Sequence, residues 1–255
     1  MVPESMMLAA LTRLYPFVPG PEALPDVPAL LGERGGEFCI STRLDPQMVA
    51  AVCRCGYLPM SEDMTGRELL LIKSHTSRCI LDPSRLHVSR STRRRARGLR
   101  LRVDSSFGRC LDRIVKHHAD ERWLTQRLCD AFTKLHDRPM SGVRMRSVEV
   151  YGAGGMVAGE IGYTCGRAYT SLSGFHAVSG AGSVQLACLG RLLDEADFAF
   201  WDLGMEIEYK HALGATSVDR PRFLERYRSV RDQPTPNLRT DVECGTLLCV
   251  QDSTG

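Results

Sequence analysis

Three strand-like stretches separated by glycine-rich turns constrain the fold of this chain more than any other part of its sequence. The stretches run over 146–151, 156–164 and 168–172. Glycine-containing segments at 152–155 and 166–167 separate them. Short turns rich in glycine are typical of hairpins between antiparallel strands. We therefore predict that the middle of the chain forms an antiparallel meander.

Amphipathic helices are predicted on both sides of this meander. Apolar side chains recur at spacings of three and four residues over 107–115 and 123–135, and again over 184–197. The apolar run 199–203 then predicts a buried strand that carries one acid. Two helices, a run of hairpins, a further helix and a strand follow in the order typical of an α+β fold. We expect a mainly antiparallel central sheet flanked by helices.

The first part of the chain predicts a smaller unit. Prolines between 16 and 28 interrupt any long helix, which indicates an irregular entry segment. Asp45 can cap a helix over 46–55 that has a proline in its first turn. The segment 56–61 is predicted to be a turn, and 69–73 a buried strand.

These elements divide the chain into three expected parts. A boundary near 75–77 separates a small N-terminal domain, 1–76, from a larger domain, 77–232. Prolines and a Ser-Thr-Gly ending are typical of a mobile segment, which predicts a C-terminal tail over 233–255. The apolar run 246–250 could still dock against the larger domain.

Positive charge is concentrated in one stretch of an otherwise balanced chain. From Arg85 to Arg102 the sequence has eight arginines and no acid, whereas the whole chain carries 33 basic and 30 acidic side chains. A guanidinium presents a planar fork of donors that matches two phosphate oxygens. The stretch therefore predicts a nucleic-acid contact, with a solvated charged face or a targeting patch as the alternative. Alternation over 99–103 predicts a strand whose arginines share one face.

Disulfide-bonded, zinc-binding and membrane proteins are not expected. The ten cysteines are predicted to be free thiols, because the chain is long and its start, with Pro3 and Glu4, does not resemble a secretory signal. Cys53 and Cys55 lack a second pair that would complete four zinc ligands, so no metal site is expected. No apolar run approaches the ~20 residues that cross a bilayer. We expect a cytoplasmic protein without a membrane partner.

A glycine loop precedes the helix predicted over 184–197. Gly180, Gly182 and Ser183 fall at the helix start, where backbone N–H groups are unpaired and the helix dipole is positive. The loop is therefore a candidate site for a phosphate or another oxyanion. A plain glycine turn with a serine cap is the alternative.

Short motifs in one order carry a family resemblance that covers about residues 25 to 230. They are Cys55-Gly56-Tyr57-Leu58-Pro59, Leu86-His87-Val88-Ser89-Arg90-Ser91, Phe107-Gly108, Arg122-Trp123-Leu124-Thr125, 131–136, Ser147-Val148-Glu149-Val150 and Leu213-Gly214-Ala215. As a set they resemble the leucyl/phenylalanyl-tRNA-protein transferases, enzymes that move an amino acid from a charged tRNA to the N-terminus of a protein. The resemblance implies a small N-terminal domain joined to a larger domain of the GNAT acyltransferase type.

The resemblance also implies binding roles for residues of this chain. The implied contacts of the tRNA acceptor end are Arg90, Arg93, Arg94, Arg95 and Arg97. The implied substrate-binding residues are Trp123, Met60, Glu149, Ser173 and Gly204. Trp123 is similar to the aromatic residue on which the terminal adenosine stacks, and Met60 can line an apolar pocket for a leucine side chain. The implied partners are tRNA and the N-terminus of an acceptor protein, with aminoacyl-tRNA as co-substrate, no cofactor and a monomeric enzyme.

The implied reaction is aminolysis of an ester by an α-amino group. It needs a neutral amine, a polarised carbonyl and hydrogen-bond donors for the tetrahedral oxyanion. Asp202 matches the family's aspartate and is implied to be the catalytic residue that orients the amine. This chain has Gly204 where the family has a glutamine, and the family's glutamate falls near Ser173.

Two other functions remain open at this point. A GNAT acyltransferase that uses acyl-CoA would bind a pyrophosphate on Gly180 and Gly182. A tRNA-binding protein that keeps the scaffold without the chemistry is compatible with Ser173 and Gly204 at the altered positions.

Overall fold

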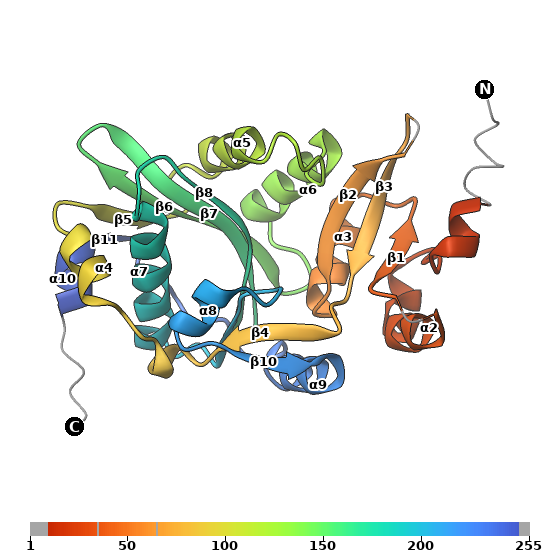
Figure 1. Cartoon of the computed structure of the whole chain (residues 1–255). Helices are drawn as coiled ribbons and strands as arrows, with labels where there is room; N and C mark the ends of the chain where they lie inside the picture. Colours follow the sequence, from red (N-terminus) through yellow and green to blue (C-terminus); the bar gives the residue numbers. More distant parts are fainter. Residues whose placement is uncertain (1–9, 35, 65, 250–255) are drawn as a thin grey trace.

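Two β-sheets organise the chain. The computed structural model describes residues 10–34, 36–64 and 66–249. A three-stranded sheet formed by N-terminal residues lies beside an eight-stranded sheet formed by the rest (Figure 1). None of the helices in the described residues is long and apolar enough to cross a membrane. The chain thus has the α+β architecture that the order of its elements predicts.

The smaller sheet is antiparallel and has the order β1–β3–β2. Its strands are β1 (Phe38–Ser41), β2 (Leu58–Asp63) and β3 (Glu68–Lys73). The helices of this part are η1 (Pro21–Asp26), α2 (Val27–Arg34) and α3 (Pro46–Arg54). Asp45 caps α3, because its Oδ1 accepts a hydrogen bond from the Met48 amide at 3.0 Å. This cap and the β3 strand confirm the local predictions for these residues.

The turn predicted over 56–61 is wrong for most of that segment. Gly56, at φ +83°, turns the chain after α3, and β2 starts at Leu58. Each residue of β2 then has a partner on β3. Pairing with a strand that comes later in the chain therefore overrides the local turn signal.

The larger sheet has the order β10–β4–β9–β8–β7–β6–β5–β11. Its strands are β4 (Ser77–Leu81), β5 (Arg100–Val103), β6 (Val143–Gly152), β7 (Gly155–Cys165), β8 (Ala168–His176), β9 (Phe200–Asp202), β10 (Thr216–Asp219) and β11 (Asp241–Glu243). Strands β6, β7 and β8 form the predicted meander, and Gly166, at φ +56°, makes the turn between the last two. Within the described residues, β8 and β9 are the only neighbouring strands that run parallel.

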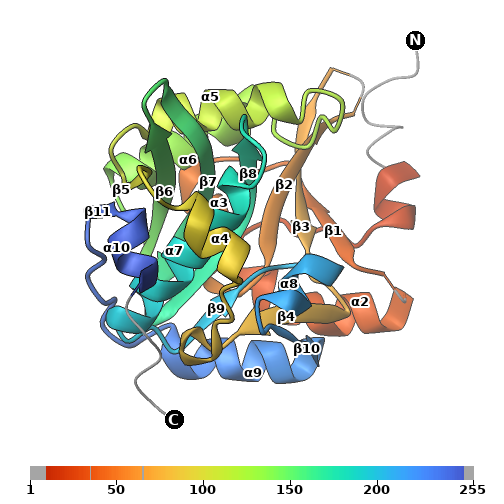
Figure 2. The same ribbon diagram turned by 60° about the vertical axis from the view of Figure 1, so that its left-hand side comes forward.

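Helices cover both faces of the larger sheet. They are η2 (Pro83–Arg85), α4 (Arg90–Arg95), α5 (Phe107–His117), α6 (Gln126–Asp137), α7 (Ala181–Glu195), α8 (Glu208–Ala212), α9 (Arg220–Val230) and α10 (Cys244–Cys249). Helices α5 and α6 cover one face, whereas α7, with α4 and α10 beside it, covers the other (Figure 2). Each face therefore has its own hydrophobic core.

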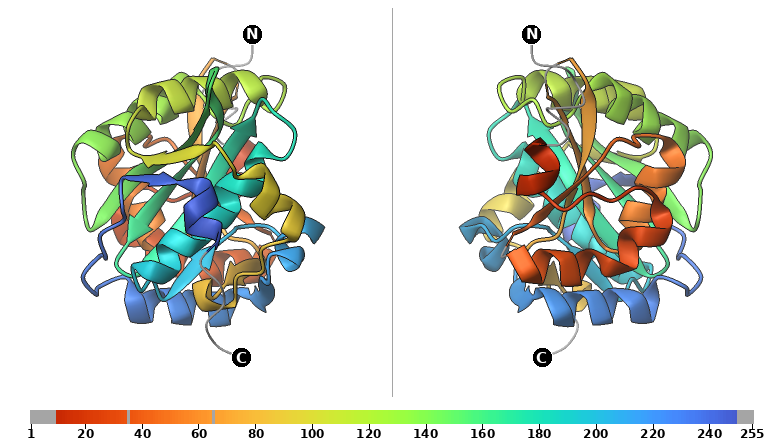
Figure 3. Two further views of the ribbon diagram at one scale, coloured as in Figure 1. Left: turned by 90° about the vertical axis from the view of Figure 1, so that its left-hand side faces the viewer. Right: turned by 90° about the vertical axis from the view of Figure 1, so that its right-hand side faces the viewer.

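The core under α5 and α6 extends into the N-terminal part of the chain. It contains Leu70 and Ile72 of β3 together with Met145 of β6 and Tyr227 of α9. The right-hand view of Figure 3 shows the N-terminal elements against the larger part of the molecule. The small sheet and the large sheet are thus joined by shared apolar packing.

The C-terminal segment differs from the expected mobile tail. Strand β11 extends the large sheet, with Val242 opposite Leu101 of β5. Helix α10 follows directly and buries Leu247 and Leu248 in the core under α7. These apolar residues dock because they cover the remaining edge and face of the α7 layer, which the prolines before them do not reveal. Residues 250–255 lie outside the described part of the chain.

Candidate active site

A cleft lies where β8 and β9 separate. The two strands pair only over residues 168–170 and 200–202, and β8 continues to His176. Two cavities, of ≈450 Å³ and ≈390 Å³, lie beside this extension of β8. Both are lined by Ser171, Leu172, Ser173, Gly174, Leu203, Tyr209 and Lys210, so they form one continuous cleft. We call the larger the Trp123 cavity and the smaller the Glu160 cavity, after a residue that lines each.

The Trp123 cavity brings together four of the five residues implied to bind substrate. These are Met60 from β2, Trp123 from the loop before α6, Ser173 from β8 and Gly204 from the loop after β9. The Trp123 carbonyl accepts hydrogen bonds from the amide and the hydroxyl of Ser61, at 2.9 and 3.0 Å. Strand β2 therefore holds the half-buried tryptophan at the cavity.

His75 also lines the Trp123 cavity, although the sequence did not single it out as a site residue. Its Nδ1 lies 3.6 Å from Oε2 of Glu37. Burial and the nearby positive charge of Arg78 lower the pKa of His75 to about 4. The imidazole is therefore neutral at pH 7, and the cavity wall carries no positive charge at this position.

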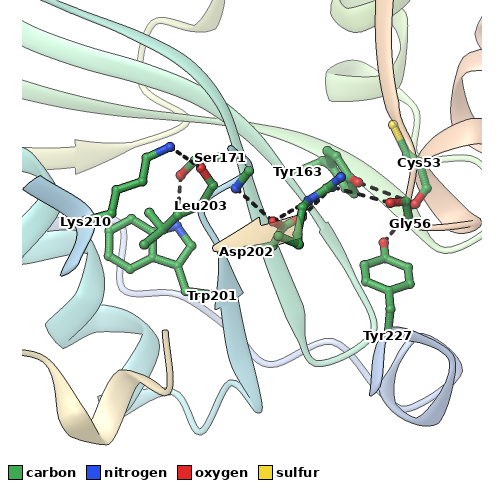
Figure 4. A network of polar contacts seen from close by, with 11 residues as sticks. Cys53, Gly56, Tyr163, Ser171, Trp201, Asp202, Leu203, Lys210 and Tyr227 are labelled. Carbon is green, nitrogen blue, oxygen red and sulfur yellow. Dashed lines mark hydrogen bonds and ion pairs between the residues drawn. The ribbon is translucent and has the colours of Figure 1, made fainter. Parts of the chain in front are cut away.

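Asp202 lies behind the wall of the cleft and lines neither cavity. Its carboxylate is fully buried in a polar network (Figure 4) and binds the Arg78 guanidinium, with Nε–Oδ1 at 2.9 Å and Nη2–Oδ2 at 2.8 Å. Although burial disfavours the charge of Arg78, this carboxylate keeps the pKa of Arg78 above its ordinary value. Oδ1 also accepts a hydrogen bond from the Gly204 amide at 2.9 Å.

The expected direct contact between Asp202 and an amine is corrected by this geometry. Both carboxylate oxygens of Asp202 are already bonded to Arg78, and one is also bonded to the amide of Gly204. Gly204 itself lines the Trp123 cavity. Asp202 is therefore placed to position the cleft wall and not to touch a substrate.

Glu149 is the implied substrate contact that the structure does not bring to the cleft. It is fully buried on β6, where its carboxylate accepts hydrogen bonds from the amides of Ser105 and Ser106 and from the Ser147 hydroxyl. These amides lie at the start of α5, which lacks a side-chain cap from Ser106. Glu149 thus supplies acceptors for the unpaired donors of a helix N-terminus.

The basic stretch forms helix α4 at the end of the Glu160 cavity. Ser89 caps the helix by accepting a hydrogen bond from the Thr92 amide at 3.2 Å. The exposed arginines of this stretch include Arg90, Arg94, Arg95 and Arg97. Arg93 is partly buried and donates to the carbonyl of Leu248 in α10, so at least part of its role is structural.

The predicted oxyanion loop lies between α4 and the cleft. Gly180, Gly182 and Ser183 all line the Glu160 cavity. Gly180 has a left-handed backbone, with φ +80°, and a Cβ at this position would lie 2.6 Å from Cδ of Arg95. The loop and the arginines of α4 are therefore packed together at one end of the cleft.

No metal centre is found in the part of the chain that the structure describes. Over residues 10–34, 36–64 and 66–249, no three histidine, cysteine, aspartate or glutamate side chains are grouped so that they could hold a metal ion. The cleft offers carbonyl, hydroxyl and amide groups instead.

Glu160 is a cleft residue that sequence reasoning missed. It lies on β7, is 3% exposed, and lines the smaller cavity. Its Oε1 accepts hydrogen bonds from the Tyr169 hydroxyl at 3.0 Å and the Ser171 hydroxyl at 2.9 Å. Burial raises the pKa of Glu160 to about 7, although these hydrogen bonds favour the charged form. One signal was present in the sequence, because a lone acid occurs in the otherwise apolar strand predicted over 156–164.

Comparison with known proteins gives one consistent family. The family model described as "Leucyl/phenylalanyl-tRNA protein transferase" matches residues 80–228, which include Trp123, Ser173 and Gly204. Curated proteins named leucyl/phenylalanyl-tRNA–protein transferase are similar over most of their length. The protein from Azoarcus sp. is 30% identical over 221 residues, covering 84% of this chain and 91% of that protein. Those from Pseudomonas paraeruginosa and Pseudomonas putida are 32% and 33% identical, each covering 89% of this chain and 96% and 97% of the relative. With these matches across the cleft and its supporting strands, the chain belongs to the leucyl/phenylalanyl-tRNA–protein transferase family.

Proposed function

We propose that this chain is an aminoacyltransferase that moves an amino acid from a charged tRNA to the N-terminal α-amino group of a protein. One observation carries the proposal. A single cleft runs from the exposed arginines of α4, past the glycine loop and the free part of β8, to Trp123. A tRNA acceptor end offers phosphates, an ester and a terminal adenosine in the same order. The names of the curated relatives support this assignment.

The tRNA is held by charge at one end of the cleft and by stacking at the other. Arg90, Arg94 and Arg95 pair with phosphates of the acceptor strand, and the amides of the Gly180–Ser183 turn add neutral donors. The terminal adenosine stacks on Trp123, an interaction of about 1–3 kcal/mol per base. This arrangement places the ester beside the shared wall formed by Ser171 to Gly174.

The reaction at this wall is attack of the amine nitrogen on the ester carbonyl. A C–N bond forms, the C–O bond to the ribose breaks, and the ribose oxygen leaves with a proton that the amine gives up. Among the described residues, β8 has no strand partner on the β9 side beyond Thr170, so its backbone amides are available as donors to the oxyanion. Asp202 positions Gly204 at this site, and the neutral His75 does not repel an incoming ammonium group.

The acceptor and the state of the enzyme complete the proposal. An acceptor peptide enters past the exposed residues Met205, Ile207 and Tyr209, which border the Trp123 cavity. The cleft is formed within one chain, which supports a monomeric enzyme. Charged tRNA as co-substrate supports action in the cytoplasm, without any cofactor.

A transfer assay tests this function without assuming which amino acid is used. Bulk tRNA charged with a mixture of amino acids is incubated with a peptide that has a free N-terminal Arg or Lys. We expect a product one residue longer by mass spectrometry, no product from the N-acetylated peptide, and a large loss of product with Trp123→Ala.

The alternative functions have their own signatures in the same set of experiments. No elongated product at micromolar enzyme would contradict the proposal. Retained tRNA binding without transfer would indicate a binding protein, whereas calorimetric heat with acetyl-CoA at a defined stoichiometry would indicate a CoA-dependent enzyme. Neither alternative is supported by the relatives' names.

A further inference from the structure

The floor of the Glu160 cavity is polar, although the sheet around it is apolar. Glu160 and Gln185 line this cavity and are only 3% and 4% exposed. Gly182 and Ser183, which line the same cavity, are more exposed and form its rim. A side chain that enters past the rim therefore meets a carboxyl group and an amide.

The hydrogen bonds around Glu160 leave one of its oxygens free for a ligand. Oε1 accepts from Tyr169 and Ser171. Trp201 Nε1 donates to the Ser171 hydroxyl oxygen at 2.9 Å, which leaves the hydroxyl proton of Ser171 directed at Glu160. Oε2 receives no hydrogen bond from the described residues. The donors around the carboxyl group thus fix its orientation and leave Oε2 as an acceptor.

The amide of Gln185 gives a second, independent indication of a ligand. Its Nε2 is buried and makes no hydrogen bond to any described residue. Buried polar groups without partners are rare in folded proteins, because each costs about 1–3 kcal/mol. A ligand with polar atoms in the Glu160 cavity would remove this cost.

The nearest lysine does not serve as a counter-ion for Glu160. Lys210 Nζ donates to the carbonyls of Leu203 and Met205, both at 2.6 Å. No ion pair joins Glu160 to a lysine, arginine or histidine of the described residues. A buried carboxyl group with donors on one oxygen and no cation is therefore electrostatically incomplete, and a bound cation would complete it.

We propose that Glu160 and Gln185 select the side chain of the transferred amino acid, and that this side chain is cationic, that of arginine or lysine. The proposal rests on the function proposed above and names its substrate class. A guanidinium or an ammonium group donates to Oε2 of Glu160, and the amide of Gln185 can offer its carbonyl oxygen to the same group. A leucine side chain would cover the carboxyl group without giving it a partner.

Transfer rates for defined aminoacyl-tRNAs test this selectivity. tRNAs charged with arginine, lysine, leucine or phenylalanine are compared at pH 8 with the same acceptor peptide. We expect kcat/KM for arginine or lysine to exceed that for leucine and phenylalanine by about tenfold or more. Glu160→Gln should remove most of this preference, and Glu160→Met should shift it towards leucine. Glu225→Gln, which removes an exposed carboxylate of α9, is the matched control and should keep the preference.

The outcomes separate this proposal from the proposed function. Faster transfer of leucine or phenylalanine by the wild type, or an unchanged preference in Glu160→Gln, overturns the cationic assignment and leaves the transferase intact. If no charged tRNA reacts, the transferase proposal fails. Calorimetry with unreactive 3′-amide-linked arginyl- and leucyl-adenosine then still decides the pocket. Tighter binding of the arginyl compound that is lost in Glu160→Gln supports the proposal, and equal binding of the two compounds overturns it.

Discussion

Replacing Glu160 by glutamine should change how the stability of the chain depends on pH. In the unfolded chain the carboxyl group loses its proton near its ordinary value of 4.5, whereas burial raises the pKa to about 7 in the folded chain. Between these values the folded state holds more protons than the unfolded state. The stability of the wild type therefore falls as the pH rises from 4.5 through 7. Glutamine has no proton to lose, so the variant does not lose this stability.

The size of the effect follows from the two pKa values. Each pKa unit corresponds to about 1.4 kcal/mol, so the variant should gain about 3 kcal/mol in free energy of unfolding relative to the wild type between pH 4.5 and pH 7. Above pH 7 the difference should stay constant. The reason is that Glu160 is buried without a cation, while the hydrogen bonds of Tyr169 and Ser171 only partly stabilise its charge.

Urea unfolding at several pH values measures this difference. The chain has two tryptophans, and Trp201 is hydrogen-bonded to Ser171 beside Glu160, so its fluorescence should report unfolding around this site. Wild type and Glu160→Gln are compared at pH 5, 6, 7 and 8, with Glu225→Gln on the surface of α9 as the control. A difference between wild type and Glu160→Gln that does not vary with pH would refute the reasoning. So would the same pH dependence in the surface variant.

Three further predictions concern the ion pair, the stacking residue and the arginines. Asp202→Asn should lower the free energy of unfolding by about 3–5 kcal/mol, because it leaves Arg78 buried without its partner; chemical denaturation that shows less than about 1 kcal/mol would exclude a tightly coupled pair. Trp123→Ala should weaken binding of charged tRNA by about 1–3 kcal/mol, measured by filter binding, with unchanged affinity as the contradicting result. Arg90→Ala together with Arg94→Ala should flatten the log–log salt dependence of tRNA binding by ~0.7 for each lost phosphate contact on a single strand, and a parallel plot would remove α4 from the interface.

The elements that depend on local patterns were predictable from the sequence. The strands β6 to β8 and the helices α5 to α7 follow from glycine turns and from apolar residues at helical spacing. Strands β4, β10 and β11 were missed, since each is short and pairs with residues far away in the chain. The pairing of Arg78 with Asp202 was missed for the same reason, because 124 residues separate the two.

The two buried glutamates show why the candidate site was only partly predictable. Glu149 lies opposite Gly159, and Glu160 lies opposite Val148, in adjacent rows of the β6–β7 pair. Side chains in adjacent rows point to opposite faces of a sheet. Glu149 therefore supports α5, whereas Glu160 reaches the cleft beside α7. Both are single acids in apolar strands, so composition and spacing alone do not distinguish them.

Arg78 also has a consequence for how the whole chain unfolds. Besides Asp202, its guanidinium contacts the carbonyl of Gly56, at 3.4 Å, in the turn that leads into the small sheet. The hydroxyl of Tyr227 in α9 donates to the nearby carbonyl of Cys53, at 2.9 Å. The turn after α3 is thus tied to β4 and α9 as well as sharing a core with them. Loosening the N-terminal part would expose the same apolar surface and break the same polar contacts that hold the cleft wall, so the two sheets should be lost in one cooperative transition.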